Sequence, residues 1–200
     1  MKTLRFSVLK LLNEQKQQKI YKAMHKNAKH KYESVGWLSD ERQNIRFEKL
    51  IDGLELEGKK ILDFGCGLGA FCGFLKKKGV NCDYTGIDIV DSFVKKAAAE
   101  YPDATFLHTS ILDFHGDFDY VFSSGVYAFC SRELFFECVK KSLELAKSEY
   151  RFNMLIDAKG DGYFRFSAYE LSRFLPQFER RSSIVGEYLE NDITIYLRIN

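Results

Sequence analysis

The sequence predicts an α/β fold, a doubly wound and mostly parallel sheet that ends in an antiparallel hairpin. Between residues 59 and 157, short apolar stretches alternate with amphipathic helical ones. Repeated strand–helix units of this kind form parallel sheets with helices on both faces. After residue 178, "ERRSSIVGEYL" and "DITIYLRI" alternate with a period of two around "ENDI", which is typical of an antiparallel hairpin. With 200 residues, 46% of them apolar, the chain can bury one sizeable core.

Two helices are expected before the sheet. Residues 7–32 place Leu9, Leu12, Ile20, Tyr21 and Met24 near one helical face. A second helix runs to about Leu54, with Ser39 or Asp40 as its N-cap. We therefore expect a basic helical segment, residues 1–36, that packs on or caps a domain formed by residues 37–200.

The remaining elements follow from local signals. The expected strands are 59–64, 83–89, 104–110, 118–125 and 150–157, and the expected helices are 69–79, 91–101, 132–147 and 168–175. Gly79 ends the first of these helices, and Pro102 follows the second. Ser167 can cap the last one.

Charge is unevenly distributed along the chain. The net charge is +2, but residues 1–31 carry +8, with Glu14 as their one acid, so the remainder carries −6. Such asymmetry predicts either a surface that binds anions or a solvated helix that covers the domain.

The sequence excludes several classes of protein. No apolar run approaches the ~20 residues that span a bilayer, and no secretory cleavage site follows the N-terminus, so we expect a cytoplasmic protein without a membrane span. The five cysteines form no CxxC pair, which favours reduced thiols and no metal site.

A glycine-rich turn follows the first expected strand. "GCGLGA" (65–70) fits a dinucleotide fingerprint in which Ala70 replaces the third glycine and Asp88 binds a ribose. However, Asp63 stands two residues before Gly65, and a carboxylate there would repel a pyrophosphate. It would attract the sulfonium and ammonium groups of S-adenosylmethionine (SAM). The acid therefore favours SAM.

The successive motifs resemble those of class I SAM-dependent methyltransferases. The motifs are "ILDFGCGLGAF", "YTGIDIVDSFVKKA", "FLHTSILDF" and "FDYVFSSGVY", and they match in order and spacing over residues 37–200. The segment "WLSDERQNIRF" (37–47) is similar to the helix that covers the cofactor in a small-molecule subgroup. The resemblance implies a Rossmann-like sheet of seven strands, SAM as cofactor, S-adenosyl-L-homocysteine (SAH) as product and a small-molecule acceptor.

The resemblance also implies roles for individual residues. The loop at the methionine end comprises Asp63, Phe64, Gly65, Cys66, Gly67 and Gly69. Asp88 binds the ribose and Ile89 packs on adenine. Ser110 stands where the family often has an Asp for the adenine amino group, so Ser110 or the amide of Ile111 substitutes. Ser123, Ser124 and Gly125 face the methyl group, and Trp37, Gln43 and Arg46 are candidates to contact the SAM carboxylate or the substrate.

Catalytic groups are harder to assign from the residues. Methyl transfer from a sulfonium is a direct displacement that requires no metal and needs a base only if the nucleophile must lose a proton. Tyr127 and His108 are the candidates. The expected acceptor atom is oxygen or nitrogen, and an anionic metabolite would suit the basic segment. RNA methylation is the weaker alternative, because "SSGVY" lacks the signature of base amino methyltransferases, and a non-catalytic SAM-binding protein is the third. The sequence carries no signal for the oligomeric state.

Overall fold

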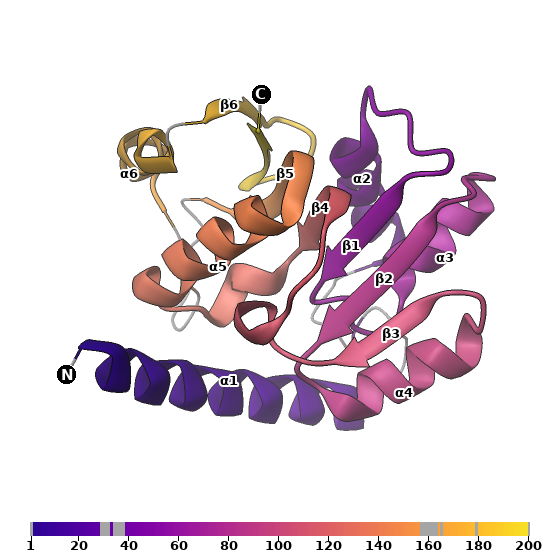
Figure 1. Ribbon diagram of the computed structural model, residues 1–200, viewed down its shortest axis with the longest axis horizontal. Helices are drawn as coiled ribbons and strands as arrows, with labels where there is room; N and C mark the ends of the chain where they lie inside the picture. The colour runs from indigo at the N-terminus through magenta and orange to yellow at the C-terminus, as the bar shows by residue number, and fades with distance from the viewer. Residues whose placement is uncertain are drawn as a thin grey trace.

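The computed structural model describes residues 2–28, 33, 39–156, 164, 166–178 and 180–199 of the chain. In these ranges seven strands form one sheet, in the order β3-β2-β1-β4-β5-β7-β6 (Figure 1). The strands are β1 (Lys60–Phe64), β2 (Asp83–Asp88), β3 (Thr105–His108), β4 (Phe118–Ser124), β5 (Ala146–Leu155), β6 (Arg181–Val185) and β7 (Asp192–Arg198).

The pairing confirms the predicted sheet. The first five strands pair in parallel, whereas β7 runs antiparallel to both β5 and β6. The chain builds outward from β1 to β3 and then returns to place β4 on the other side of β1. A reversal of this kind opens a crevice at the carboxyl ends of the strands, where ligands bind in open α/β sheets.

Helices cover both faces of the sheet. On one face lie α2 (Asp40–Ile51), α3 (Ala70–Lys77) and α4 (Asp91–Glu100), and on the other lie α5 (Arg132–Leu145) and α6 (Ala168–Phe174). Phe47 of α2 and Phe71 of α3 contact each other over Ile61 of the sheet. Phe135 of α5 packs on Phe152 on the opposite face. These aromatic contacts orient the helices that border the crevice.

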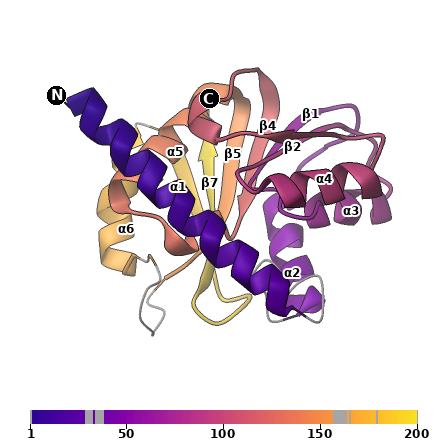
Figure 2. The ribbon, with the colours of Figure 1, turned by 90° about the horizontal axis from the view of Figure 1, so that it is seen from below.

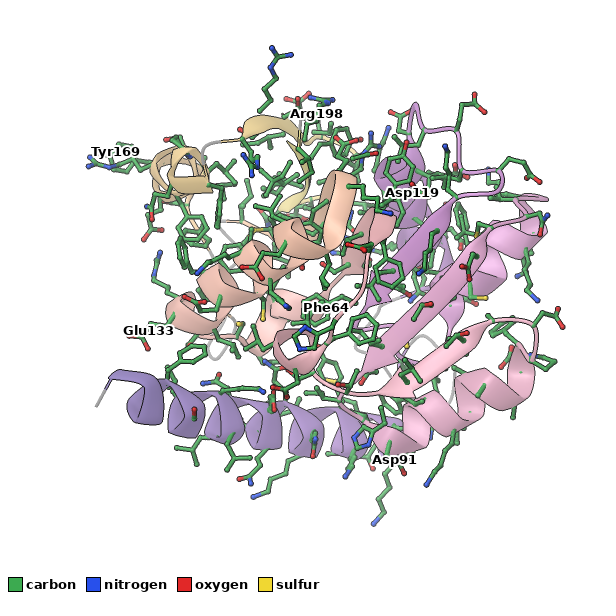
Figure 3. All side chains as sticks on the ribbon, in the orientation of Figure 1. Phe64, Asp91, Asp119, Glu133, Tyr169 and Arg198 are labelled. Atoms are coloured by element: carbon green, nitrogen blue, oxygen red, sulfur yellow. The ribbon has the colours of Figure 1, made fainter. Side chains whose placement is uncertain are left out.

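The first helix, α1 (Lys2–Asn27), crosses the carboxyl ends of the parallel strands (Figures 1 and 2). Lys10 forms an ion pair with Asp113, and the Gln18 side chain donates a hydrogen bond to the Ile89 carbonyl at 2.8 Å. Figure 3 labels Asp91, at the start of α4, near the C-terminal half of α1. These two contacts hold α1 across the crevice, one at Asp113 after β3 and one at Ile89 after β2.

The expected apolar face of α1 is wrong at one position. Leu12 is 59% exposed, because the side of α1 that faces the domain carries Glu14, Gln17 and Tyr21 over a cavity. The helix ends at Asn27, and residues 29–32 of the expected helix lie outside the described residues. The division into segments 1–36 and 37–200 stays a prediction.

One strand begins earlier than expected. β5 starts at Ala146, immediately after α5, and pairs with β4 from that residue onward. No glycine or proline separates the helix from the strand, so the sequence lacks the usual boundary signal. No helix within the described ranges is long and apolar enough to cross a membrane.

Candidate active site

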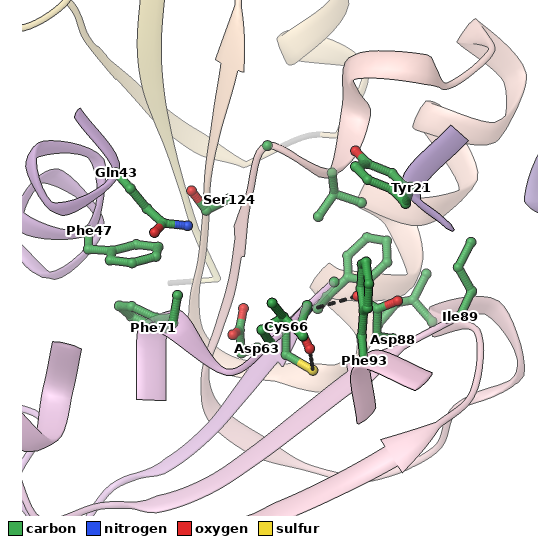
Figure 4. Close-up of a pocket in the computed structure, with 18 of the residues that line it drawn as sticks. Tyr21, Gln43, Phe47, Asp63, Cys66, Phe71, Asp88, Ile89, Phe93 and Ser124 are labelled. Atoms are coloured by element: carbon green, nitrogen blue, oxygen red, sulfur yellow. Dashed lines mark hydrogen bonds between the residues drawn. The ribbon is translucent and has the colours of Figure 1, made fainter. Parts of the chain in front are cut away.

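A cavity of about 420 Å³ lies at the carboxyl ends of β1, β2 and β4. Its walls come from the glycine turn after β1, the ends of β2 and β4, and the short helices η2 (Ile111–Asp113) and η3 (Val126–Phe129). Helices α1 and α2 add side chains from the open side. Figure 4 shows Asp63, Cys66 and Asp88 between the residues of α2 and α3 on one side and Tyr21, Ile89 and Phe93 on the other.

The glycine turn packs closely against the end of β4. Gly65, Gly67 and Gly69 all have positive φ angles, of 76°, 54° and 78°. A Cβ on Gly65 would lie 2.4 Å from a methyl carbon of Val126. Only glycine combines this left-handed conformation with so close an approach, so backbone alone forms this wall of the cavity.

Asp63 places a buried carboxyl beside the turn. Its side chain accepts a hydrogen bond from the Tyr84 hydroxyl of the neighbouring strand. Burial, with a smaller contribution from the nearby Asp88, raises the pKa of Asp63 to about 7, although the hydrogen bond from Tyr84 acts to lower it. A cation in the cavity would stabilise the ionised form.

Asp88 connects the end of β2 to the glycine turn. Its two oxygens accept hydrogen bonds from the Gly67 amide at 2.9 Å and the Val90 amide at 2.8 Å. Burial raises the pKa of Asp88, whereas these amides act to lower it. Each carboxylate oxygen has a second lone pair, so Asp88 can also accept hydrogen bonds from a ligand, and Ile89 lines the cavity beside it.

Helix α2 brings one of its two predicted residues to the cavity. Gln43 is 7% exposed and lines the cavity near Ser124 and Asp63 (Figure 4). Arg46 instead forms a buried ion pair with Asp192 of β7, and it is not among the lining residues. Trp37, the third candidate of this segment, lies outside the described residues.

The residues at the end of β4 face two different surroundings. Ser124 and Gly125 line the cavity, whereas Ser123 is buried against the hydroxyl of Tyr150 at 2.8 Å. Tyr127 lines the cavity with a ring that is 2% exposed, and its hydroxyl lies 2.6 Å from that of Tyr150. Burial raises the pKa of Tyr127 well above its usual value, so this side chain is a neutral phenol.

The other catalytic candidate lies elsewhere. His108 is exposed on the edge strand β3, with one ring nitrogen 3.1 Å from the Ile89 carbonyl oxygen, and it does not line the cavity. Ser110 and Ile111 do line it, as do Phe64, Cys66, Gly65 and Gly67. Gly69 lies behind the turn, against Tyr101 and Ala97. No group of three or more metal-ligating side chains occurs in the described part of the chain.

Sequence reasoning missed the contribution of α1. Glu14, Gln17 and Tyr21 occupy helix positions that face the same way and line the cavity. One signal was available, because Glu14 is the single acid among nine Lys and Arg residues in positions 1–31. The partners of the buried groups, Tyr84 for Asp63 and Tyr150 for Tyr127, carried no local signal.

Part of the chain is similar in sequence to known methyltransferases. Residues 61–148 match a family model described as "Methyltransferase domain". Rv1506c of Mycobacterium tuberculosis, a protein named as a methyltransferase, is 36% identical over 70 residues. This alignment covers 34% of the present chain and 41% of that relative, so less than half of either protein is matched.

Solved structures share the fold at low sequence identity. The DhpI–SAM–HEP complex has a TM-score of 0.71 at 18% identity and covers 91% of this chain and 95% of its own. Magnesium protoporphyrin IX methyltransferase of Synechocystis PCC 6803 with bound SAM has a TM-score of 0.63 at 16% identity, with 80% of each chain covered. Residues 61–148 thus match a methyltransferase domain, and the seven-stranded fold is shared with methyltransferase structures that hold SAM. The family match covers less than half of the chain, and the solved structures show a shared fold.

Proposed function

We propose that the protein transfers a methyl group from SAM to an oxygen or nitrogen atom of a small molecule and releases SAH. The observation that carries this proposal is the pair of carboxyls on either side of the glycine turn in one cavity, Asp63 buried and Asp88 half-buried. A cationic tail and a ribose require acceptors at these two places.

The residues present fit the cofactor. The glycine turn offers bare backbone where any Cβ on Gly65 would clash. Gln43 is buried at the methionine end, and no described residue pairs with its side-chain amide. This amide opens onto the cavity and can donate hydrogen bonds, so it is suited to bind the SAM carboxylate. Ile89 and Ile111 provide apolar contacts for the base.

In the proposed reaction the protein positions the two substrates and excludes water from the reacting atoms. SAM supplies a methyl group on a cationic sulfur that leaves as a neutral thioether. Asp63 holds positive charge at the turn, while Ser124 and Gly125 leave room at the end of β4. Phe64 and Tyr127 contact each other and form an apolar floor, which keeps water from the reacting atoms. We propose that Tyr127 acts as a neutral wall or hydrogen-bond donor rather than as a base.

The charges of the lining bear on the acceptor. In the described residues the cavity is lined by Glu14, Asp40, Asp63, Asp88 and Glu100, with Lys77 as the cation and without an imidazole. This balance favours a neutral or cationic acceptor over the anionic metabolite that the basic segment suggested. It also favours an acceptor atom that has a free lone pair near neutral pH.

Ligand-dependent unfolding tests the cofactor. SAM and SAH should raise the melting temperature, because a ligand that binds only the native state stabilises it, and NAD(H) should not. Asp88→Ala should abolish the shift. Stabilisation by NAD(H) alone would contradict the proposal.

A screen of fractionated metabolites tests the activity. SAH formation should appear with particular fractions and disappear in Asp88→Ala. If SAM binds but no fraction yields SAH, the non-catalytic SAM-binding alternative gains support.

A further inference from the structure

Two polar side chains of α1 lie in the cavity without a partner. Gln17 is 7% exposed, and neither its amide nor the carboxylate of Glu14 forms a hydrogen bond or ion pair with any described residue. The polar atoms of both side chains open onto the cavity and are not fully enclosed by protein. The free amide and carboxylate therefore point to a polar ligand in this part of the cavity.

The contacts of α1 show which part of the cavity these two residues cover. Lys10 is bound to Asp113 at the end of η2, and Gln18 is bound to the Ile89 carbonyl after β2. Glu14 and Gln17 lie between these two anchors and face the cavity. They therefore cover the part of the cavity between η2 and the residue that follows β2, and the Glu14 carboxylate also acts on the Cys138 thiol of α5.

This part of the cavity lies at the base end of the proposed cofactor site. If Asp88 holds the ribose, the base extends past Ile89 toward Ser110 and Ile111. The exocyclic amine of adenine is a donor and needs an acceptor there. After β3, Ser110 Oγ accepts the Leu112 amide at 3.3 Å and keeps one lone pair, so this loop offers a neutral acceptor in place of a carboxylate. The one carboxylate of η2, Asp113, is 63% exposed and bound to Lys10.

We propose that Glu14 and Gln17 of α1 recognise the adenine edge of the cofactor, so that α1 is part of the cofactor site. The inference rests on the proposed function. Glu14 accepts a hydrogen bond from the exocyclic amine, and the Gln17 amide pairs with the remaining donor and acceptor atoms of that edge. A glutamine side chain can pair with the amine and the adjacent ring nitrogen of adenine at once.

The test compares SAH with S-inosyl-L-homocysteine, its counterpart with an oxygen in place of the adenine amine. The wild-type protein should bind SAH more tightly by isothermal titration calorimetry, since Glu14 repels the new oxygen. Glu14→Gln should weaken SAH binding roughly ten- to a hundredfold, as expected for a charged hydrogen bond. The same variant should bind S-inosyl-L-homocysteine better than the wild type does, because the new amide donates to its oxygen.

Matched variants on the same helix control for disturbance of α1. Gln17→Ala should also weaken SAH binding, whereas Gln15→Ala, on the exposed side of α1, should leave it unchanged. If Glu14→Gln and Gln17→Ala bind SAH as tightly as the wild type, with an unchanged ratio between the two ligands, the adenine role is overturned while the proposed function stands. A wild type that binds neither SAM nor SAH would overturn both.

Discussion

At the scale of single residues, the ionisation of Asp63 decides how strongly the cavity attracts a cation. Its pKa of about 7 lies above the ordinary 3.8, so the fold favours the protonated form. The contribution of Asp63 to the stability of the ligand-free protein is therefore full below the ordinary pKa and is lost as the pH rises through about 7. A bound cation instead stabilises the ionised form of Asp63.

We expect the affinity for SAM to depend on this proton. Below about pH 7 the proton must leave before the carboxylate can pair with the cation, so affinity should fall as the pH decreases, by at most about tenfold per pH unit. Calorimetry from about pH 6 to about pH 8 measures this slope. Asp63→Asn should bind more weakly and without the slope, and an equal slope in that variant would assign the pH dependence to another group.

The glycine turn offers a second prediction at this scale. Gly65 and Gly58 both have positive φ angles, but a Cβ on Gly58 would meet nothing within 4 Å, whereas one on Gly65 would meet Val126 at 2.4 Å. Gly58→Ala should cost about 1 kcal/mol from backbone strain alone. Gly65→Ala should cost roughly 1–3 kcal/mol more. Urea denaturation gives both values. Equal costs would show that Val126 moves to accommodate the added methyl group.

At the scale of elements, the ion pair of Arg46 and Asp192 connects α2 to β7. Both side chains are almost fully buried, and the Tyr188 hydroxyl also donates to Asp192 at 3.2 Å. The pair orients the helix that carries Gln43 into the cavity. Arg46 thus acts on the site through helix position in this structure.

Breaking this pair on one side should be costly. Arg46→Met leaves the Asp192 carboxylate buried without its cation, which typically costs about 3–5 kcal/mol. Arg46→Met combined with Asp192→Asn should recover much of the loss, because no charge is left unpaired. Chemical denaturation of the three proteins checks this. If instead Arg46→Met left stability unchanged but reduced SAM affinity, a direct contact with the cofactor would be indicated.

The elements that the sequence predicted well are those with local signals. The strand predicted at 59–64 lies at Lys60–Phe64, because an apolar run and the glycines after it mark its end. The terminal hairpin was predicted because its alternation has a period of two. Arg46 could not be placed by such signals. Its partner lies 146 residues further along the chain, and only the assembled sheet brings β7 to α2.

The residues that line the cavity were also predicted only where a local sequence signal marked them. Asp63, Asp88 and the glycine turn were predicted to share a site because they end neighbouring parallel strands. Asp63, Asp88, Gly65 and Gly67 line one cavity, whereas Gly69 lies behind the turn. Gln17 was not predicted, since a helix that precedes the sheet can dock on any part of it. Its location depends on tertiary anchors such as Lys10 to Asp113, which are 103 residues apart.

At the scale of the whole molecule, four lysines of α1 lie on its exposed side. Lys16, Lys19, Lys22 and Lys26 are exposed along α1, while the side that faces the cavity carries Glu14 and Gln17. The exposed side of α1 is positively charged and the cavity lining is negatively charged, so the two surfaces suit different ligands. Polyanions such as RNA would meet the outer face, and a small acceptor would enter the cavity.

This separation predicts how the protein responds to RNA. Binding to a single-stranded RNA should be weak and salt-dependent, with a slope of log affinity against log salt of roughly −3 if all four lysines take part. Replacing the four with glutamine should remove most of that slope and leave SAM binding and SAH formation from a small acceptor unchanged. Lys140→Gln with Lys147→Gln, two exposed lysines of α5 and β5, is the control. RNA-dependent SAH formation that the fourfold variant loses would instead favour the RNA methyltransferase alternative, because α1 would then deliver the substrate as well as cover the cavity.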